Sequence, residues 1–355
     1  MIESSLPHGE PVLLPSRSFG RQARSVAAYS LLTALMMITP MLVFVPAALM
    51  HCAIRNGRRA AWAALGLSVA IATLYGAAPA IAKLYGMDIP PADPNGQKLA
   101  WSLLAAVVLA VALPAMAAIP MIERGENFGR VLVFLLAGAV VGLAVTEVAS
   151  QMLLSFSPYA AQVEQYTRQS AEVLAIQGKG MSPDMMALPQ RWVRFTTYVL
   201  PAMLLVNTTL VFILSLLMLG RLKAWRERMA RTGDGTALGA YLFRNFALPD
   251  WLLFVFVLGG LTPLVTGLLQ KVAANTLAVV VFLFILQGLA IFRFVLASMG
   301  LGMAGTMLGW LLLLVLTLTG GIGPLLLGMA GLFDPFFDFR HFKKRKDDSH
   351  ESHSD

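Results

Sequence analysis

The stretch VLVFLLAGAVVGLAVTEVASQMLLS, residues 131 to 155, decides the class of this protein. Glu147 is the only charged residue in it. A run of about 20 apolar residues can cross the ~30 Å hydrocarbon core of a bilayer as a helix. Because a helix satisfies its own backbone hydrogen bonds, it can lie in lipid without water. The stretch therefore predicts a transmembrane helix.

The same character recurs on both sides of this stretch. Five further apolar stretches occupy residues 60 to 82, 99 to 121, 195 to 219, 251 to 269 and 274 to 297. Of the 355 residues, 57% are hydrophobic and 13% charged, whereas soluble domains carry roughly 25% charged residues. We therefore predict an all-α fold, a polytopic transmembrane helical bundle with six regular spans, in the inner membrane of a bacterial cell.

The first and last apolar stretches are interrupted. Ala27 to Ile54 contains Pro40 and Pro46, and Met303 to Phe333 contains the run GGIGP at residues 320 to 324. Proline removes a helical hydrogen bond and glycine loosens a helix, so both stretches are predicted to be broken or re-entrant. They bring the number of hydrophobic segments to eight. The first stretch is too long for a signal-peptide core, so we expect it to remain in the protein.

The positive-inside rule predicts the orientation. If both interrupted stretches turn back as hairpins, 20 of the 27 Lys and Arg residues fall on one side, whereas straight spans divide them 15 to 12. This favours one membrane domain, 27 to 334, between two cytoplasmic tails, 1 to 26 and 335 to 355. The net charge of +8 then reflects topology, and no nucleic-acid partner is expected.

Two connections are long. The predicted outer loop, 156 to 194, places Val163, Tyr166, Ser170, Val173 and Leu174 near one helical face. It is either an amphipathic lid on the membrane or a solvated connector. The predicted cytoplasmic loop, 220 to 250, carries a basic flank with Arg226, Arg228 and Arg231. It would pack on anionic lipid or dock a membrane or cytoplasmic partner.

Glu147 is the first candidate for a substrate or proton site. A carboxylate is costly in lipid, so Glu147 should face the bundle or a watery cavity. Gln151 lies one turn further on. The alternative is a structural carboxylate that reaches the interface or pairs with a cation. Small residues repeat at four-residue steps beside Glu147 and allow close helix approach: Gly138, Gly142, Thr146 and Ser150.

Other polar residues are weaker candidates. Gln287 and Asn207 lie within apolar stretches, where amides bind ligands or hold helices together. Asp334 and Asp338, followed by Arg340, could share a cation or perform acid–base chemistry, although an aromatic interfacial belt with local charge pairing is the simpler explanation. A single cysteine, Cys52, excludes an internal disulfide. No metal site or cofactor is predicted.

Three C-terminal stretches are similar to a known family: FRNFALPDWL (residues 243 to 252), LQGLAIFRF (286 to 294) and GLFDPFFDFR (331 to 340). They resemble the YybS-like family of predicted bacterial membrane proteins, a domain of unknown function (DUF2232). The residues that carry the resemblance are Pro249, Trp251, Gln287, Gly288, Asp334, Asp338 and Arg340. The resemblance implies an integral membrane location. It also implies a distant similarity to the substrate-binding membrane subunits of energy-coupling-factor vitamin transporters, and hence a small-molecule-binding core.

These observations favour a non-enzymatic, transport-like or small-molecule-binding bundle. Broken helices expose backbone groups that bind solutes. Since no nucleotide-binding loop is present, energy would come from a partner ATPase or an ion gradient. The alternative is an envelope scaffold that recruits a partner through its basic cytoplasmic loop. A third hypothesis is a membrane enzyme that uses Asp334 and Asp338.

Overall fold

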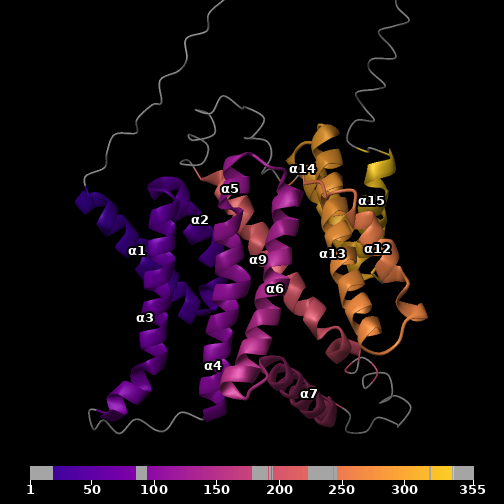
Figure 1. Cartoon of the computed structure of the whole chain (residues 1–355). Coiled ribbons are helices and arrows are strands. Elements are labelled where there is room, and N and C mark those ends of the chain that lie inside the picture. Colours follow the sequence, from indigo (N-terminus) through magenta and orange to yellow (C-terminus); the bar gives the residue numbers. More distant parts are fainter. Residues whose placement is uncertain are drawn as a thin grey trace, which may run out of the picture.

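The computed structural model describes residues 19–84, 94–177, 191, 193, 195–222, 243, 246–319, 321–337 and 339 (Figure 1). All regular elements in this part of the chain are helical. The first half contains α1 (Phe19–Ile38), η1 (Pro40–Phe44), α2 (Val45–Asn56), α3 (Arg58–Leu84), α4 (Pro94–Ala106), the π-helical turn η2 (Val107–Ala112), α5 (Leu113–Glu123) and α6 (Phe128–Leu154). The second half contains α7 (Pro158–Gln177), α9 (Leu200–Arg221), α12 (Leu252–Gly260), η4 (Thr262–Leu264), α13 (Gly267–Ser298), α14 (Met303–Leu318) and α15 (Ile322–Phe337).

Within the described residues, five helical stretches are long and apolar enough to cross a membrane, or six if α14 and α15 form one bent span. They are Arg58–Gly76, Gly96–Glu123, Phe128–Leu154, Leu200–Arg221 and Gly267–Ser298. The predicted helical class is therefore confirmed. The eight segments and the orientation stay predictions. The start of α1 and the end of α15 lie on the side of the bundle opposite α7 (Figure 1).

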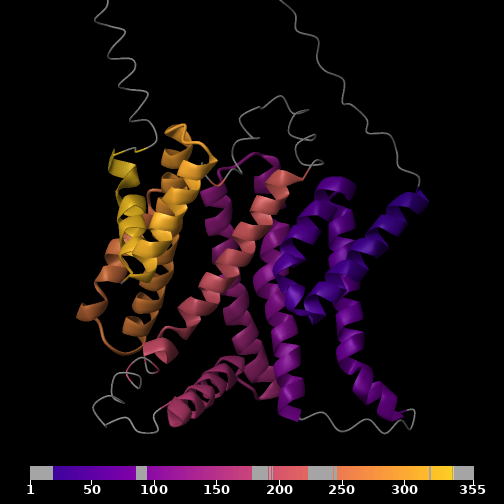
Figure 2. The ribbon, with the colours of Figure 1, turned by 180° about the vertical axis from the view of Figure 1, so that it is seen from behind.

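Both predicted interruptions are present. The first lies between α1 and α2, where the Thr39 side chain accepts a bond from the Met41 amide and Pro40 opens a 3₁₀ turn. The second lies between α14 and α15, whose axes bend by 110°. Each pair of helices turns back before it reaches the level of α7 (Figures 1 and 2).

The expected continuous span over residues 251 to 269 was wrong. Helix α12 has only nine residues and ends at Gly260. The Thr262 hydroxyl donates to the Gly259 carbonyl, and Pro263 has no amide hydrogen with which to continue the helix. The chain then reverses at Gly267, whose φ of 69° favours glycine. A short helix and a turn therefore precede the long helix α13.

The small-residue edge of α6 packs directly on the π-helical turn η2. A Cβ atom on Gly142 would overlap the Leu109 carbonyl, and one on Gly138 would lie 2.9 Å from the Pro114 side chain. Further along the same edge, the hydroxyl oxygens of Ser150 and Ser102 lie 3.0 Å apart. The four-residue repeat of small residues is thus a close helix–helix contact, as membrane bundles commonly use.

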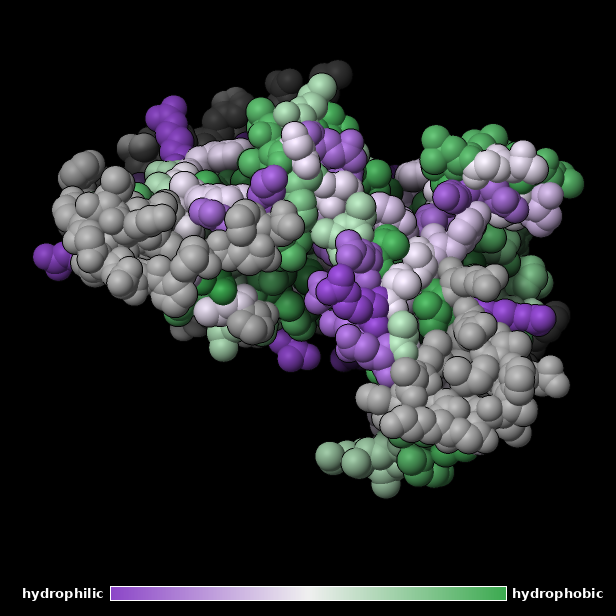
Figure 3. All heavy atoms as spheres, turned by 90° about the horizontal axis from the view of Figure 1, so that it is seen from below, coloured by the Kyte–Doolittle hydropathy of each residue, from purple (hydrophilic) through white to green (hydrophobic). Residues whose placement is uncertain are grey.

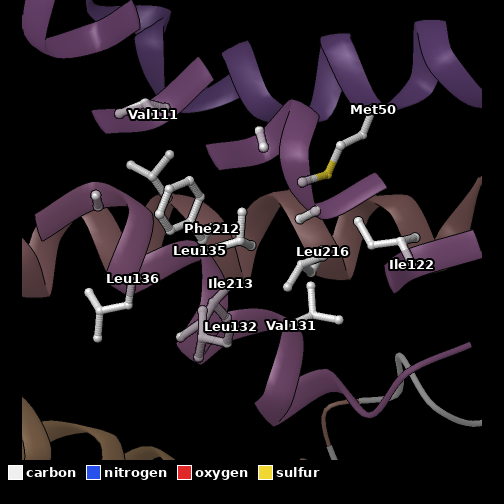
Figure 4. Packing of buried hydrophobic residues seen from close by; sticks show 14 of the residues in the cluster. Met50, Val111, Ile122, Val131, Leu132, Leu135, Leu136, Phe212, Ile213 and Leu216 are labelled. Carbon is white, nitrogen blue, oxygen red and sulfur yellow. The ribbon is translucent and has the colours of Figure 1, made fainter. Parts of the chain in front are cut away.

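The main hydrophobic core lies where α2, α5, α6 and α9 meet (Figure 4). Leu132 and Leu135 of α6 and Phe212 and Leu216 of α9 are fully buried there, together with Met50 of α2. Helix α9 therefore packs against helices of the N-terminal half of the chain through this core.

A second close contact joins α13 to α15. A Cβ atom on Gly288 would overlap the Leu327 carbonyl, and one on Gly331 would overlap the Phe284 carbonyl. Each helix thus contributes one glycine and receives one carbonyl from the other. Since lipid tails are as apolar as leucine, such close packing is a main source of helix association in a bilayer.

This contact predicts the effect of a single methyl group. Gly288→Ala forces α13 and α15 apart, and overpacking of this kind costs about 1–3 kcal/mol. We expect a lower melting temperature of the purified protein in detergent. Gly66→Ala in α3 is the matched control, because a Cβ atom added at Gly66 would meet nothing within 4 Å. Equal melting temperatures for the two variants would contradict the contact.

Candidate functional site

Glu147 holds the corner between α6 and α7. Its carboxylate accepts hydrogen bonds from the Gln151 side-chain amide (2.7 Å), from the Ser157 hydroxyl and from the Tyr159 backbone amide (3.1 Å). Ser157 in turn accepts a bond from the Ala160 amide. These amides belong to the first turn of α7, where helix donors lack partners within the helix. Glu147 and Ser157 therefore cap α7, a structural role that differs from the cation pairing expected from the sequence.

Helix α7 lies across the face of the bundle opposite the start of α1 and the end of α15 (Figures 1 and 2). Val163, Tyr166 and Ser170 of the predicted apolar face are half-buried, whereas Val173 is exposed. The side chain of Leu174 lies outside the described part of the structure. Glu164 and Arg168 on the opposite side are exposed and form an ion pair at 3.0 Å. In Figure 3, which views this face, hydrophilic residues gather across its middle. The connection thus contains a helix rather than only a solvated connector.

A small cavity of about 280 Å³ lies beneath the start of α7. Its lining residues come from α4, α6, α7 and α9, and include Ser102, Val140, Glu147, Tyr159, Gln162 and Leu205. Glu147 therefore reaches a cavity, although its oxygens already accept three hydrogen bonds. Gln151 contacts Glu147 but does not line the cavity.

A larger cleft adjoins this cavity and shares Val140, Tyr159, Pro201 and Leu205 with it. The cleft measures about 590 Å³ and lies between α6, α9, α12 and α13. Ligand pockets typically measure roughly 300–1,000 Å³ and are mostly apolar with a few polar groups. The lining of this cleft fits that description.

Asn275 fixes one wall of the cleft. Its side-chain oxygen accepts a bond from the Ala202 amide at 2.8 Å, and its side-chain nitrogen donates to the carbonyls of Tyr198 (3.2 Å) and Lys271 (2.8 Å). The Ala202 amide lies in the first turn of α9, where backbone N–H groups have no partner within the helix. Asn275 therefore joins α13 to the start of α9.

Lys271 is the charged residue of the cleft. It is exposed, lies one turn before Asn275, and lines the cleft together with Tyr159 and Tyr198. No acidic side chain lines the cleft among the described residues. The sequence analysis missed both Lys271 and Asn275. Lys271 and Asn275 are four residues apart, which places them on one face of a helix. This spacing could have indicated from the sequence that they lie together.

The family-motif residues meet around Gln287. Its side chain is buried, accepts a bond from the Leu248 amide at 3.1 Å and donates to the Asp334 carboxylate at 2.9 Å. The three stretches that carry the resemblance are thus bonded to each other beside the Gly288 crossing. A buried polar contact of this kind fixes helix positions, which makes Gln287 a packing residue in this structure.

The remaining candidates are scattered. Pro249 lies in the turn before α12, and Trp251 lines the cleft. Asn207 is exposed on α9 and lines neither cavity. Asp338 and Arg340 lie outside the described residues, so the acid–base pair with Asp334 stays a prediction. Among the described residues, no group of three or more His, Cys, Asp or Glu side chains could hold a metal ion.

The bundle of long apolar helices defines a polytopic helical membrane protein. Residues 99–335 match a family described as a predicted membrane protein (DUF2232), and the chain belongs to this family. The resemblance to YybS-like proteins is thereby confirmed. No curated protein and no solved structure matches the chain. The family identifies the chain as a membrane protein and assigns it no activity.

The capping role of Glu147 leads to a direct test. Glu147→Gln replaces one acceptor oxygen by a donor, so at least one of the three bonds is lost, at a cost of about 1–3 kcal/mol. We expect faster amide hydrogen exchange in the first turns of α7 at unchanged membrane abundance. Glu164→Gln, which removes an exposed pair worth about 0.3–0.5 kcal/mol, is the control. Unchanged exchange at Tyr159 and Ala160 in Glu147→Gln would refute the cap.

Proposed function

We propose that this protein is a transport-like membrane protein that binds a small molecule in the cleft between α6, α9, α12 and α13. The observation that carries the proposal is the cleft itself, which is of ligand size and apolar along most of its lining. Its polar residues are few and gather where α7, α9 and α13 begin. Binding sites between the helices of a bundle have this form.

The position of α7 supports the proposal. Tyr159 in its first turn lines both the small cavity and the cleft. A movement of α7 about the corner at Glu147 therefore changes access to both spaces. Lids of this kind control the entry and release of ligands.

The broken segments also support a transport-like function. The α1–α2 and α14–α15 pairs flank the long helices on either side, and each turns back within the bundle (Figure 2). Discontinuous helices are a recurring feature of transporters.

In this proposal the protein lies in the inner membrane, with the Arg-rich turns and both ends in the cytoplasm. A partner ATPase or an ion gradient supplies energy.

The scaffold hypothesis rests on the basic loop. Residues 223–242 lie outside the described residues, and so do Arg226, Arg228 and Arg231. Recruitment of a partner through this loop stays an expectation from the sequence.

A blocked cleft tests the proposal. Val140 lines both spaces and is 46% exposed, so a tryptophan can be accommodated there and would occupy part of the cleft. We expect Val140→Trp to reduce, by about tenfold or more, the amount of small molecule or lipid that co-purifies with the protein, as measured by mass spectrometry. It should also fail to rescue the defect of a deletion strain.

Val148→Trp is the matched control, because Val148 lies on the same helix, is 54% exposed and lines neither space. Both variants must reach wild-type abundance and melting temperature. Full rescue and unchanged co-purification with Val140→Trp would refute binding in the cleft.

A further inference from the structure

The cleft has a polar end and an apolar end. Lys271, Tyr159 and Tyr198 lie where α13, α7 and α9 begin, on the face that α7 covers. Leu283 marks the other end, twelve residues further along α13. At 1.5 Å per residue this separation is about 18 Å, more than half of the ~30 Å hydrocarbon core. The cleft therefore runs from the interface into the apolar interior.

A polar solute would be poorly accommodated in the deep part of this cleft. Its walls there are formed by Val133, Leu136, Val255, Val279 and Leu283. The amide of Asn275 already makes three hydrogen bonds with the backbone. Burial of a polar group without a hydrogen-bond partner is unfavourable. The lining thus favours an occupant with a long apolar portion.

The charge at the mouth favours an anion. Lys271 is the only charged residue that lines the cleft among the described residues, and no ion pair of Lys271 occurs in this part of the chain. Glu147, in the adjoining cavity, is engaged by Gln151, Ser157 and Tyr159. A lysine ammonium binds phosphate as a point charge, and its attraction is stronger beside a low-dielectric wall than in bulk water.

From this geometry we infer that the occupant of the cleft is an anionic membrane lipid, with its acyl chain along α13 and its phosphate group at Lys271. This inference rests on the proposed function and specifies its ligand class. Tyr159 and Tyr198 line the same cleft as Lys271, and tyrosine rings are enriched where membrane proteins meet lipid headgroups.

The test compares two lipids with identical acyl chains. The full-length protein is purified, incubated with mixed vesicles of equal parts phosphatidylglycerol and phosphatidylcholine, and analysed by native mass spectrometry for retained lipid. We expect about a tenfold preference for phosphatidylglycerol in the wild type. Lys271→Gln should abolish the preference, and Lys271→Arg should retain most of it because the positive charge is kept.

Lys98→Gln is the matched control. Lys98 lies in the first turns of α4 on the same face of the bundle but lines neither the cleft nor the small cavity. Lys98→Gln removes one positive charge from the same face of the bundle but not from the cleft. The preference for phosphatidylglycerol should therefore persist. Equal melting temperatures of the variants establish that each is folded.

Two results would overturn the inference. One is equal retention of the two lipids by the wild type, and the other is an unchanged preference in Lys271→Gln. An uncharged monoacylglycerol separates these failures from failure of the proposed function. If Val140→Trp blocks its retention while headgroup charge has no effect, the cleft binds amphiphiles without selecting an anion. If Val140→Trp retains it as the wild type does, the cleft is not a binding site.

Discussion

Close backbone contact between helices is the constraint on which this structure depends. Lipid tails are as apolar as leucine side chains, so burial between helices gains little in a bilayer and close packing becomes decisive. Gly142 brings α6 against the π-helical turn before α5, and Gly288 and Gly331 bring α13 and α15 together. Between these two contacts, α6 and α13 face each other with larger residues such as Val140 and Val279, and the cleft lies there.

Hydrogen bonds from polar side chains add further contacts between the helices. Asn275 joins α13 to the start of α9, Gln287 joins α13 to α15 and to the turn before α12, and Glu147 holds the start of α7. Glu147 and Asn275 each make three hydrogen bonds with protein partners, and Gln287 makes two. Glu147 and Gln287 stood out in the sequence and hold helices in place, whereas Asn275 did not stand out and fixes a wall of the cleft. Lys271 lines the same cleft and forms no ion pair among the described residues.

The sequence predicted features that depend on local pattern. The length of the apolar stretches predicted the long helices, and proline and glycine predicted both interruptions. The small-residue repeat of α6 predicted its close contact with a neighbouring helix. The span over 251 to 269 failed because hydropathy does not register the break at Thr262 and Pro263. Two partners of Glu147, Ser157 and Tyr159, lie beyond a turn, so residue spacing does not predict them. The lining of the cleft comes from five helices, α6, α7, α9, α12 and α13, and does not follow from spacing either. Asp338 and Arg340 remain untested.

The most direct test of this account is an electron cryo-microscopy map of the full-length protein in a nanodisc that contains phosphatidylglycerol. The account predicts elongated non-protein density between α6 and α13 that runs along α13 and ends beside Lys271. A map in which α6 and α13 pack against each other and leave no cleft would contradict it, as would lipid density found only on the outer surface of the bundle.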